Sequence, residues 1–164
     1  MGSNVAPTYA NIYMAVLEGE HVYSSPLWGC VRGWRRYIDD IFLIWDGDRS
    51  ELEQFHLYLN NIYPGLGFTM DCSQSKMQFL DTCVYKSDGL LHTDLFVKYT
   101  DRNNLLHFSS EHPRSMVESL PWSQLLWVRR IVSNDILVDK RLDEMCLKFL
   151  VRGYSGTDLA EFKA

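Results

Sequence analysis

Two adjacent carboxylates between apolar runs are the residues of this chain most able to do chemistry. Asp39 and Asp40 follow Tyr37-Ile38 inside the segment 34–45, where strand-forming residues flank them on both sides. At the tip of a hairpin, such like charges repel each other unless a cation bridges them. Carboxylate oxygens are hard ligands that suit Mg²⁺ and support phosphoryl transfer by two metals. Acidic residues are also favoured in turns, so the pair by itself fits a solvated hairpin turn equally well.

The elements around this hairpin are predicted from the spacing of apolar residues. A helix is expected from about Pro7 to His21, with the proline in its first turn. A second helix is expected from Ser50, as its N-cap, to about Tyr63. Both helices flank the aspartate hairpin in the sequence.

The rest of the chain is predicted to hold further strands and then helices. Three strands are expected, at Phe68–Cys72, Gln78–Lys86 and Leu90–Lys98, and Ser87-Asp88-Gly89 between the last two is a hairpin signal. After Thr100 the chain becomes irregular, and two amphipathic helices are expected at about Pro121–Asn134 and Asp135–Arg152. The fold class is therefore predicted to be α+β with a helical tail.

Composition limits the classes of protein to consider. The 164 residues are 46% hydrophobic, which suits one ordinary globular domain. No apolar run approaches the roughly 20 residues that span a bilayer, so no membrane is expected. The formal net charge of −5 argues mildly against nucleic acid as a partner. Basic residues nevertheless cluster locally, at Arg32, Arg35 and Arg36 and at Arg129, Arg130, Lys140 and Arg141.

Cysteine and histidine residues give no metal-binding pattern. Four cysteines are scattered along the chain without a CxxC pair: Cys30, Cys72, Cys83 and Cys146. His107 and His112 have no zinc-finger spacing to any of them. A reduced intracellular chain is the interpretation that this spacing favours.

Four segments in order resemble one family. Tyr37-Ile38-Asp39-Asp40 resembles the YxDD motif of reverse transcriptases, and residues 1–11 resemble the preceding motif, a Gly-x-x-x-(Ser/Ala)-Pro turn that opens a helix. Phe79-Leu80-Asp81 resembles the start of the primer-grip hairpin. Residues 98–108 resemble a segment found in Penelope-like reverse transcriptases. Nearly the whole chain thus resembles the reverse transcriptase of a Penelope-like retroelement, from just after the first catalytic aspartate into the thumb.

The resemblance implies a fold and a division of the chain. Residues 1–98 would be part of a polymerase palm, an antiparallel sheet with helices on one face, and would include the YxDD and primer-grip hairpins. Residues 99–164 would be a connector and the helical part of the thumb. The implied activity is that of an RNA-directed DNA polymerase, a nucleotidyltransferase.

The resemblance also implies roles for particular residues. Asp39 would be the principal metal ligand and Asp40 its supporting carboxylate. Lys76 would protonate the departing pyrophosphate, although an exposed lysine is more often only solvated. The remaining implied roles are nucleotide or template binding by Gly2, Ala6, Pro7 and Tyr37, primer grip by Phe79 and Leu80, and nucleic-acid backbone contact by Arg129 and Arg130.

The implied cofactor is Mg²⁺ or Mn²⁺, in a two-metal site that is incomplete in this chain. In the family a third aspartate and the fingers precede the segment that corresponds to Met1, so we expect a fragment that is inactive alone. The expected partners are an RNA template, a DNA primer, deoxynucleotide triphosphates and another chain covering the sheet edge at Trp34–Trp45. We expect an intracellular, nuclear location. Two alternatives are a non-catalytic module for nucleic-acid or protein binding and an unconstrained relic.

Overall fold

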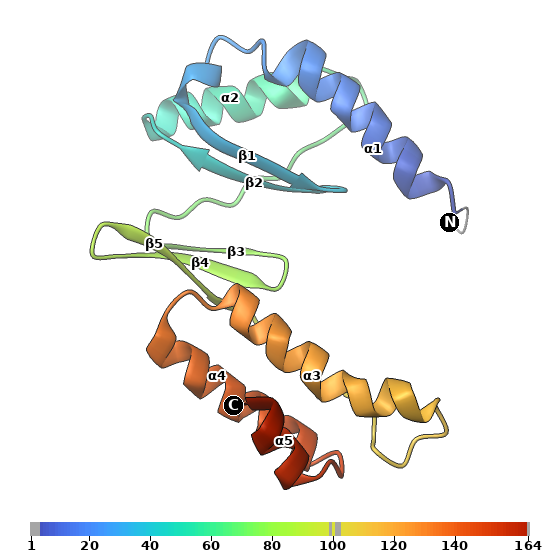
Figure 1. Ribbon diagram of the computed structural model, residues 1–164. Coiled ribbons are helices and arrows are strands. Elements are labelled where there is room, and N and C mark those ends of the chain that lie inside the picture. The colour runs from blue at the N-terminus through green and yellow to red at the C-terminus, as the bar shows by residue number, and fades with distance from the viewer. Residues whose placement is uncertain (1–3, 99, 101–102, 164) are drawn as a thin grey trace. The chain divides into compact units, whose positions relative to one another are not determined.

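The computed structural model describes residues 4–98, 100 and 103–163, which form an α+β fold of five α-helices and two antiparallel sheets (Figure 1). The chain divides into two compact units, Met1–Cys72 and Ser73–Ala164. Each unit has its own cluster of buried side chains. The division expected at residues 98 and 99 followed the domains of the family that the sequence resembles, whereas the compact units divide before the second sheet.

The first unit opens with the expected helix. Helix α1 spans Ala6–Leu17 with Pro7 in its first turn, and one π-helical turn, Glu18–Val22, continues it. Only the end of this element is buried, at Leu17, Glu18 and Val22. The apolar stripe that predicts the helix is otherwise open to solvent, since Tyr9 and Ile12 are 71% and 60% exposed.

A hairpin and a second helix complete the core of this unit. Strands β1 (Val31–Tyr37) and β2 (Asp40–Trp45) pair in antiparallel fashion and are followed by helix α2 (Arg49–Asn61). The ring of Phe55 on α2 is buried, and its centroid lies 6.4 Å from that of Trp34 and 5.4 Å from that of Trp45. Aromatic packing therefore holds α2 against one face of the hairpin.

Two local expectations in this unit are corrected. The N-cap of α2 is Asp48 and not Ser50, because the Glu51 carboxylate accepts the backbone N–H of Asp48 at 2.9 Å in a capping box. The segment Phe68–Cys72 is not a strand. The Asn60 side chain accepts the backbone N–H of Phe68 at 2.6 Å and donates to its carbonyl at 3.2 Å, so these groups are not available to a strand ladder.

The second unit begins with a three-stranded sheet. Its order is β3 (Lys76–Phe79), β4 (Thr82–Ser87) and β5 (Leu90–Leu95). The predicted hairpin turn is confirmed: Asp88 and Gly89 have φ of 52° and 78°, the positive values that a two-residue type I′ turn requires.

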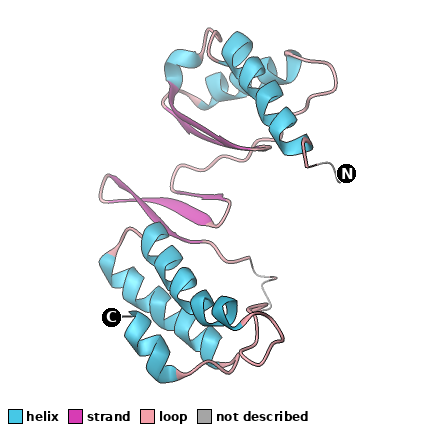
Figure 2. Ribbon diagram, turned by 45° about the vertical axis from the view of Figure 1, so that its right-hand side comes forward, coloured by secondary structure: helices cyan, strands magenta, loops and turns pink. Residues whose placement is uncertain are grey.

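Three helices follow the sheet: α3 (Arg114–Ile131), α4 (Asp135–Leu150) and α5 (Gly156–Lys163) (Figure 2). Helix α3 begins well before Pro121, where the sequence placed its start. Val117, Pro121, Leu125 and Val128 are all buried, and this continuous stripe holds the proline inside the helix. Helix α4 begins as expected, with the Asn134 side chain as its cap, whereas α5 was not expected.

Candidate functional site

The acidic pair lies at the tip of the β1–β2 hairpin, as the sequence predicts. Tyr37 and Asp40 face each other as the last strand pair, and Ile38 and Asp39 form a two-residue turn. Both aspartates are exposed, and Tyr37 is 58% exposed. Two carboxylates and a phenol thus project from one end of a hairpin that is anchored at its other end.

The register of the hairpin separates its two faces. Trp34 and Leu43 are directly opposite each other and pack on the core formed with α1 and α2. Because residues directly opposite share a face and successive residues alternate, the other face carries three pairs. These are Gly33–Ile44, Arg35–Phe42 and Tyr37–Asp40. Asp40 therefore lies on the face that does not pack on the helices.

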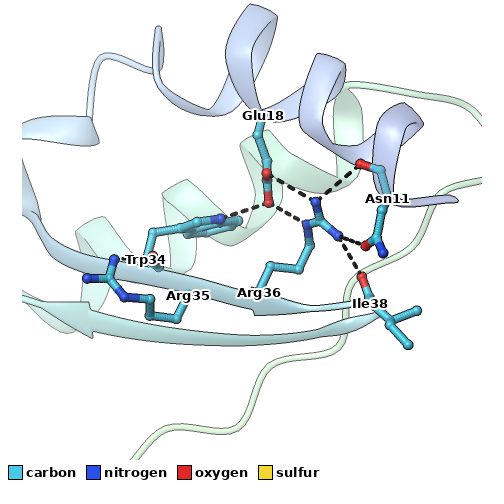
Figure 3. Close-up of polar contacts among 6 residues, drawn as sticks. All are labelled: Asn11, Glu18, Trp34, Arg35, Arg36 and Ile38. Atoms are coloured by element: carbon cyan, nitrogen blue, oxygen red, sulfur yellow. Dashed lines mark hydrogen bonds and ion pairs between the residues drawn. The ribbon is translucent and has the colours of Figure 1, made fainter. Parts of the chain in front are cut away.

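A polar network with a buried ion pair at its centre reaches the turn from the helix side (Figure 3). Arg36 Nε donates to Glu18 Oε1 at 2.7 Å, and the two side chains are only 11% and 8% exposed. Trp34 Nε1 donates to the same carboxylate oxygen at 2.9 Å. Arg36 Nη1 donates to Asn11 Oδ1 at 2.7 Å and to the Ile38 carbonyl at 3.1 Å. One guanidinium therefore links α1 and the π-helical turn to the backbone of the aspartate turn.

The turn itself has an unusual backbone. Ile38 has a φ of 56°, in the left-handed region. For a β-branched residue this conformation is a genuine outlier, with a cost of about 1–2 kcal/mol. Strain of this kind persists only where surrounding contacts hold it, and it gathers at functional sites. Here the bond from Arg36 to the Ile38 carbonyl is one such contact.

The donor set of the turn fits a hard divalent cation. Mg²⁺ keeps several water ligands and binds through one or two carboxylates together with substrate phosphates. Asp39 and Asp40 offer such carboxylates, both open to solvent. Within the part of the chain that the structure describes, no three His, Cys, Asp or Glu side chains are grouped so as to hold a metal ion. The two aspartates thus suit a site completed by water and phosphate.

Two other predicted site residues are described in the first unit. Ala6 and Pro7 are exposed in the first turn of α1. Gly2 lies outside the described residues, as do Tyr99, Asp101 and Arg102 of the segment that resembles Penelope-like enzymes.

The remaining predicted residues belong to the second unit. Lys76 is the exposed first residue of β3. Phe79 ends β3, and Leu80 opens the turn to β4 with a φ of 54°. Arg129 and Arg130 are exposed in the last turn of α3, where Arg129 donates to the Lys163 carbonyl.

The polar network behind the turn was not predicted from the sequence, although a signal for it was present. Arg36 was counted only within a basic cluster. It shares the strand face of Trp34, two positions away, and that face is apolar and turned to the core. A charged residue on such a face needs a buried partner of opposite sign. Glu18, the first residue of the π-helical turn, is that partner.

Comparison with known proteins bears on the second unit. The pattern of the animal helix-turn-helix domain matches residues 104–160, which contain α3, α4 and the start of α5. No curated protein and no solved structure matches the chain. Among the described residues, no helix is both long and apolar enough to cross a membrane.

Proposed function

We propose that this chain is part of an RNA-directed DNA polymerase of the Penelope-like kind, in which Asp39 and Asp40 bind the catalytic divalent metal. The observation that supports this proposal is their placement at the solvent-exposed tip of a hairpin whose turn is held by Arg36. A bound metal would activate the attacking primer hydroxyl and neutralise charge on the leaving group. The hairpin would hold the carboxylate oxygens at fixed positions, and Tyr37 would contact primer or template from the face it shares with Asp40.

The proposal is tested by mapping the binding of Mn²⁺, whose unpaired electrons broaden nearby amide resonances. We expect selective broadening of residues 37–41 in the full chain at millimolar Mn²⁺, and its loss in Asp39→Asn and Asp40→Asn. Asp46→Asn is the matched control, since Asp46 lies beyond the far end of β2 and pairs with Arg32 at 2.8 Å. Equal broadening around all exposed carboxylates, unchanged by Asp39→Asn, would contradict the proposal.

A second candidate function rests on a different observation, the helix-turn-helix match over residues 104–160. Motifs of this class place a helix on duplex DNA. The exposed face of α4 carries Asp135, Asp139 and Asp143 at intervals of four residues, which would repel phosphate. The exposed Arg129 and Arg130 at the end of α3 are better placed for that contact. We propose them as phosphate ligands in a nucleic-acid-binding role.

This second candidate is tested by the salt dependence of duplex binding, followed by fluorescence anisotropy. Each lysine or arginine that contacts phosphate contributes about 1 to the slope of log K against log salt. The double variant Arg129→Gln/Arg130→Gln should therefore weaken binding and lower the slope by about 2. Arg114→Gln, at the other end of the same helix, should leave the slope unchanged. Equal slopes in all three proteins would contradict the assignment.

A further inference from the structure

The guanidinium of Arg36 does more than fill a buried position, because its donors point in three different directions. Nε donates to Glu18 Oε1 at 2.7 Å, and Nη1 donates to both Asn11 Oδ1, at 2.7 Å, and the Ile38 carbonyl, at 3.1 Å (Figure 3). A planar guanidinium fixes the directions of its donors, which an ammonium group does not. The position of the Ile38 carbonyl is thereby tied to two points on the preceding helical segment.

The orientation of Arg36 is itself fixed by its neighbours. Glu18 is 6% exposed, and its carboxylate is held from a second side by Trp34 Nε1 at 2.9 Å. Such a buried ion pair adds little to net stability, because desolvation offsets the attraction between the charges. Its better-supported use is to specify one arrangement of the groups around it.

The residue that receives this bond is the one under strain. Ile38 has a φ of 56° and directly precedes Asp39 in the two-residue turn. If the turn relaxed to an ordinary backbone, the directions of both Asp39 and Asp40 would change. The contact from Arg36 therefore acts at a point of the hairpin where a change of backbone would displace both carboxylates.

We infer that Arg36 is the positioning residue of the metal-binding turn: oriented by Glu18 and Asn11, it holds the Ile38 carbonyl and so sets the geometry of Asp39 and Asp40. The inference deepens the proposed polymerase function and rests on it for the role of the two carboxylates. The Arg36 side chain is only 11% exposed and would act through the turn, without contacting the metal itself. Outer contacts of this kind change metal affinity by about 10- to 100-fold when they are removed.

The test uses the full chain, Mn²⁺ alone as the probe, and two measurements. The first is the order of the Ile38 and Asp39 amides from ¹⁵N relaxation without metal, and the second is Mn²⁺ affinity from the broadening of residues 37–41. Arg36→Lys keeps the positive charge but loses the fixed donor directions of the guanidinium. We therefore expect a mobile turn and about tenfold weaker Mn²⁺ binding. Arg32→Lys is the matched control on the same strand, since Arg32 forms an exposed pair with Asp46.

Two further variants separate positioning from general loss of stability. Asn11→Ala removes an exposed partner of Arg36 and should loosen the turn in a chain that remains folded. Leu59→Ala weakens the buried core of the same unit without touching the turn. The backbone order of the turn and the Mn²⁺ affinity should therefore match those of the wild type.

The sign of the effect gives another check. Replacing Arg36 by neutral Gln removes a positive charge that repels Mn²⁺. If electrostatics alone mattered, the variant would therefore bind Mn²⁺ more strongly. Positioning predicts weaker binding instead. The inference is overturned if Arg36→Lys and Asn11→Ala leave the turn as ordered as it is in Arg32→Lys. If the wild type binds no Mn²⁺ at the turn, the metal site is wrong, and the relaxation measurement still decides whether Arg36 holds the turn.

Discussion

Asp94 on β5 and Arg141 on α4 form a two-point ion pair, with Nε to Oδ1 at 2.9 Å and Nη2 to Oδ2 at 2.6 Å. The two side chains are 15% and 26% exposed. Hydrogen bonds from Arg141 hold the pKa of the Asp94 carboxyl below its ordinary value. This pair fastens the three-stranded sheet to the helices of the second unit.

The first prediction concerns the contribution of this pair to stability. Asp94→Asn should lower the free energy of unfolding at pH 7 by about 1–3 kcal/mol, because it removes the two-point carboxylate partner of a partly buried guanidinium and leaves it only its bond to Glu144. Asp143→Asn is the matched control, since the Asp143 carboxylate is 63% exposed in its pair with Lys163 and should matter little. Urea unfolding measures both. Equal changes in the two variants would show that the Asp94 pair has no special role.

The lowered pKa of Asp94 also fixes the sign of a pH dependence. A carboxyl whose pKa is lower in the folded state contributes its full stability above its unfolded pKa, about 3.9, and loses that contribution as the pH falls through the folded value. The difference in stability between wild type and Asp94→Asn should therefore shrink on acidification below about pH 4. Urea unfolding at a series of pH values checks this, and a difference that grows with acid would contradict it.

The strained turn gives a third prediction. Ile38→Gly removes a strain of about 1–2 kcal/mol, while the greater flexibility of the unfolded glycine chain costs about 0.5–1 kcal/mol, so the variant should be as stable as the wild type or up to about 1.5 kcal/mol more stable. The bond from Arg36 is to the backbone carbonyl and survives the change. Ile41→Gly, in a strand position of β2, should be destabilising. A comparable loss of stability in both glycine variants would show that Ile38 is not strained.

Much of the fold could be predicted from local sequence, because local chemistry fixes it. Pro7 and the spacing of apolar residues identify α1, and Asp88-Gly89 identifies the turn between β4 and β5. The aspartate hairpin follows from apolar runs on both sides of two acids. In each of these cases the residues that determine the element lie within it, so the α+β class was predicted and is confirmed.

The errors share a different cause, since contacts with residues outside the predicted element decide its structure. Pro121 would start a helix on local grounds, but burial between Val117 and Leu125 keeps it inside α3. Asn60 binds the backbone of Phe68 and prevents a strand that its β-forming neighbours favour. The ion pair of Glu18 and Arg36 joins residues eighteen positions apart. The alternation of side chains along β1 predicts that Arg36 needs a buried partner, but it does not identify Glu18 as that partner. The hairpin that carries the two aspartates could thus be predicted from sequence, whereas the network that contacts its turn could not.

Helix α1 gives a fourth prediction, on self-association. Residues Ala6–Leu17 carry no charge, and Tyr9 and Ile12 are 71% and 60% exposed. A helix that is apolar on several sides is normally covered, and an open patch of this kind favours association. We expect the chain to associate at micromolar concentration and Ile12→Lys to shift it toward monomer. Leu57→Lys, at an isolated exposed leucine of α2, should change little. A monodisperse wild-type monomer in sedimentation velocity would contradict the prediction.

The last prediction concerns catalysis by these 164 residues. Two-metal nucleotidyl transfer needs a set of carboxylates, and the described residues group no more than a pair of metal ligands at the turn. We therefore expect no primer extension on an RNA template with Mg²⁺ or Mn²⁺, from either the wild type or Asp39→Ala. Mn²⁺ binding at the turn in the same preparation would show that the site is folded, so that inactivity reflects missing ligands. Extension that Asp39→Ala abolishes would show that another residue of this chain completes the metal site, and the two-carboxylate description would be wrong.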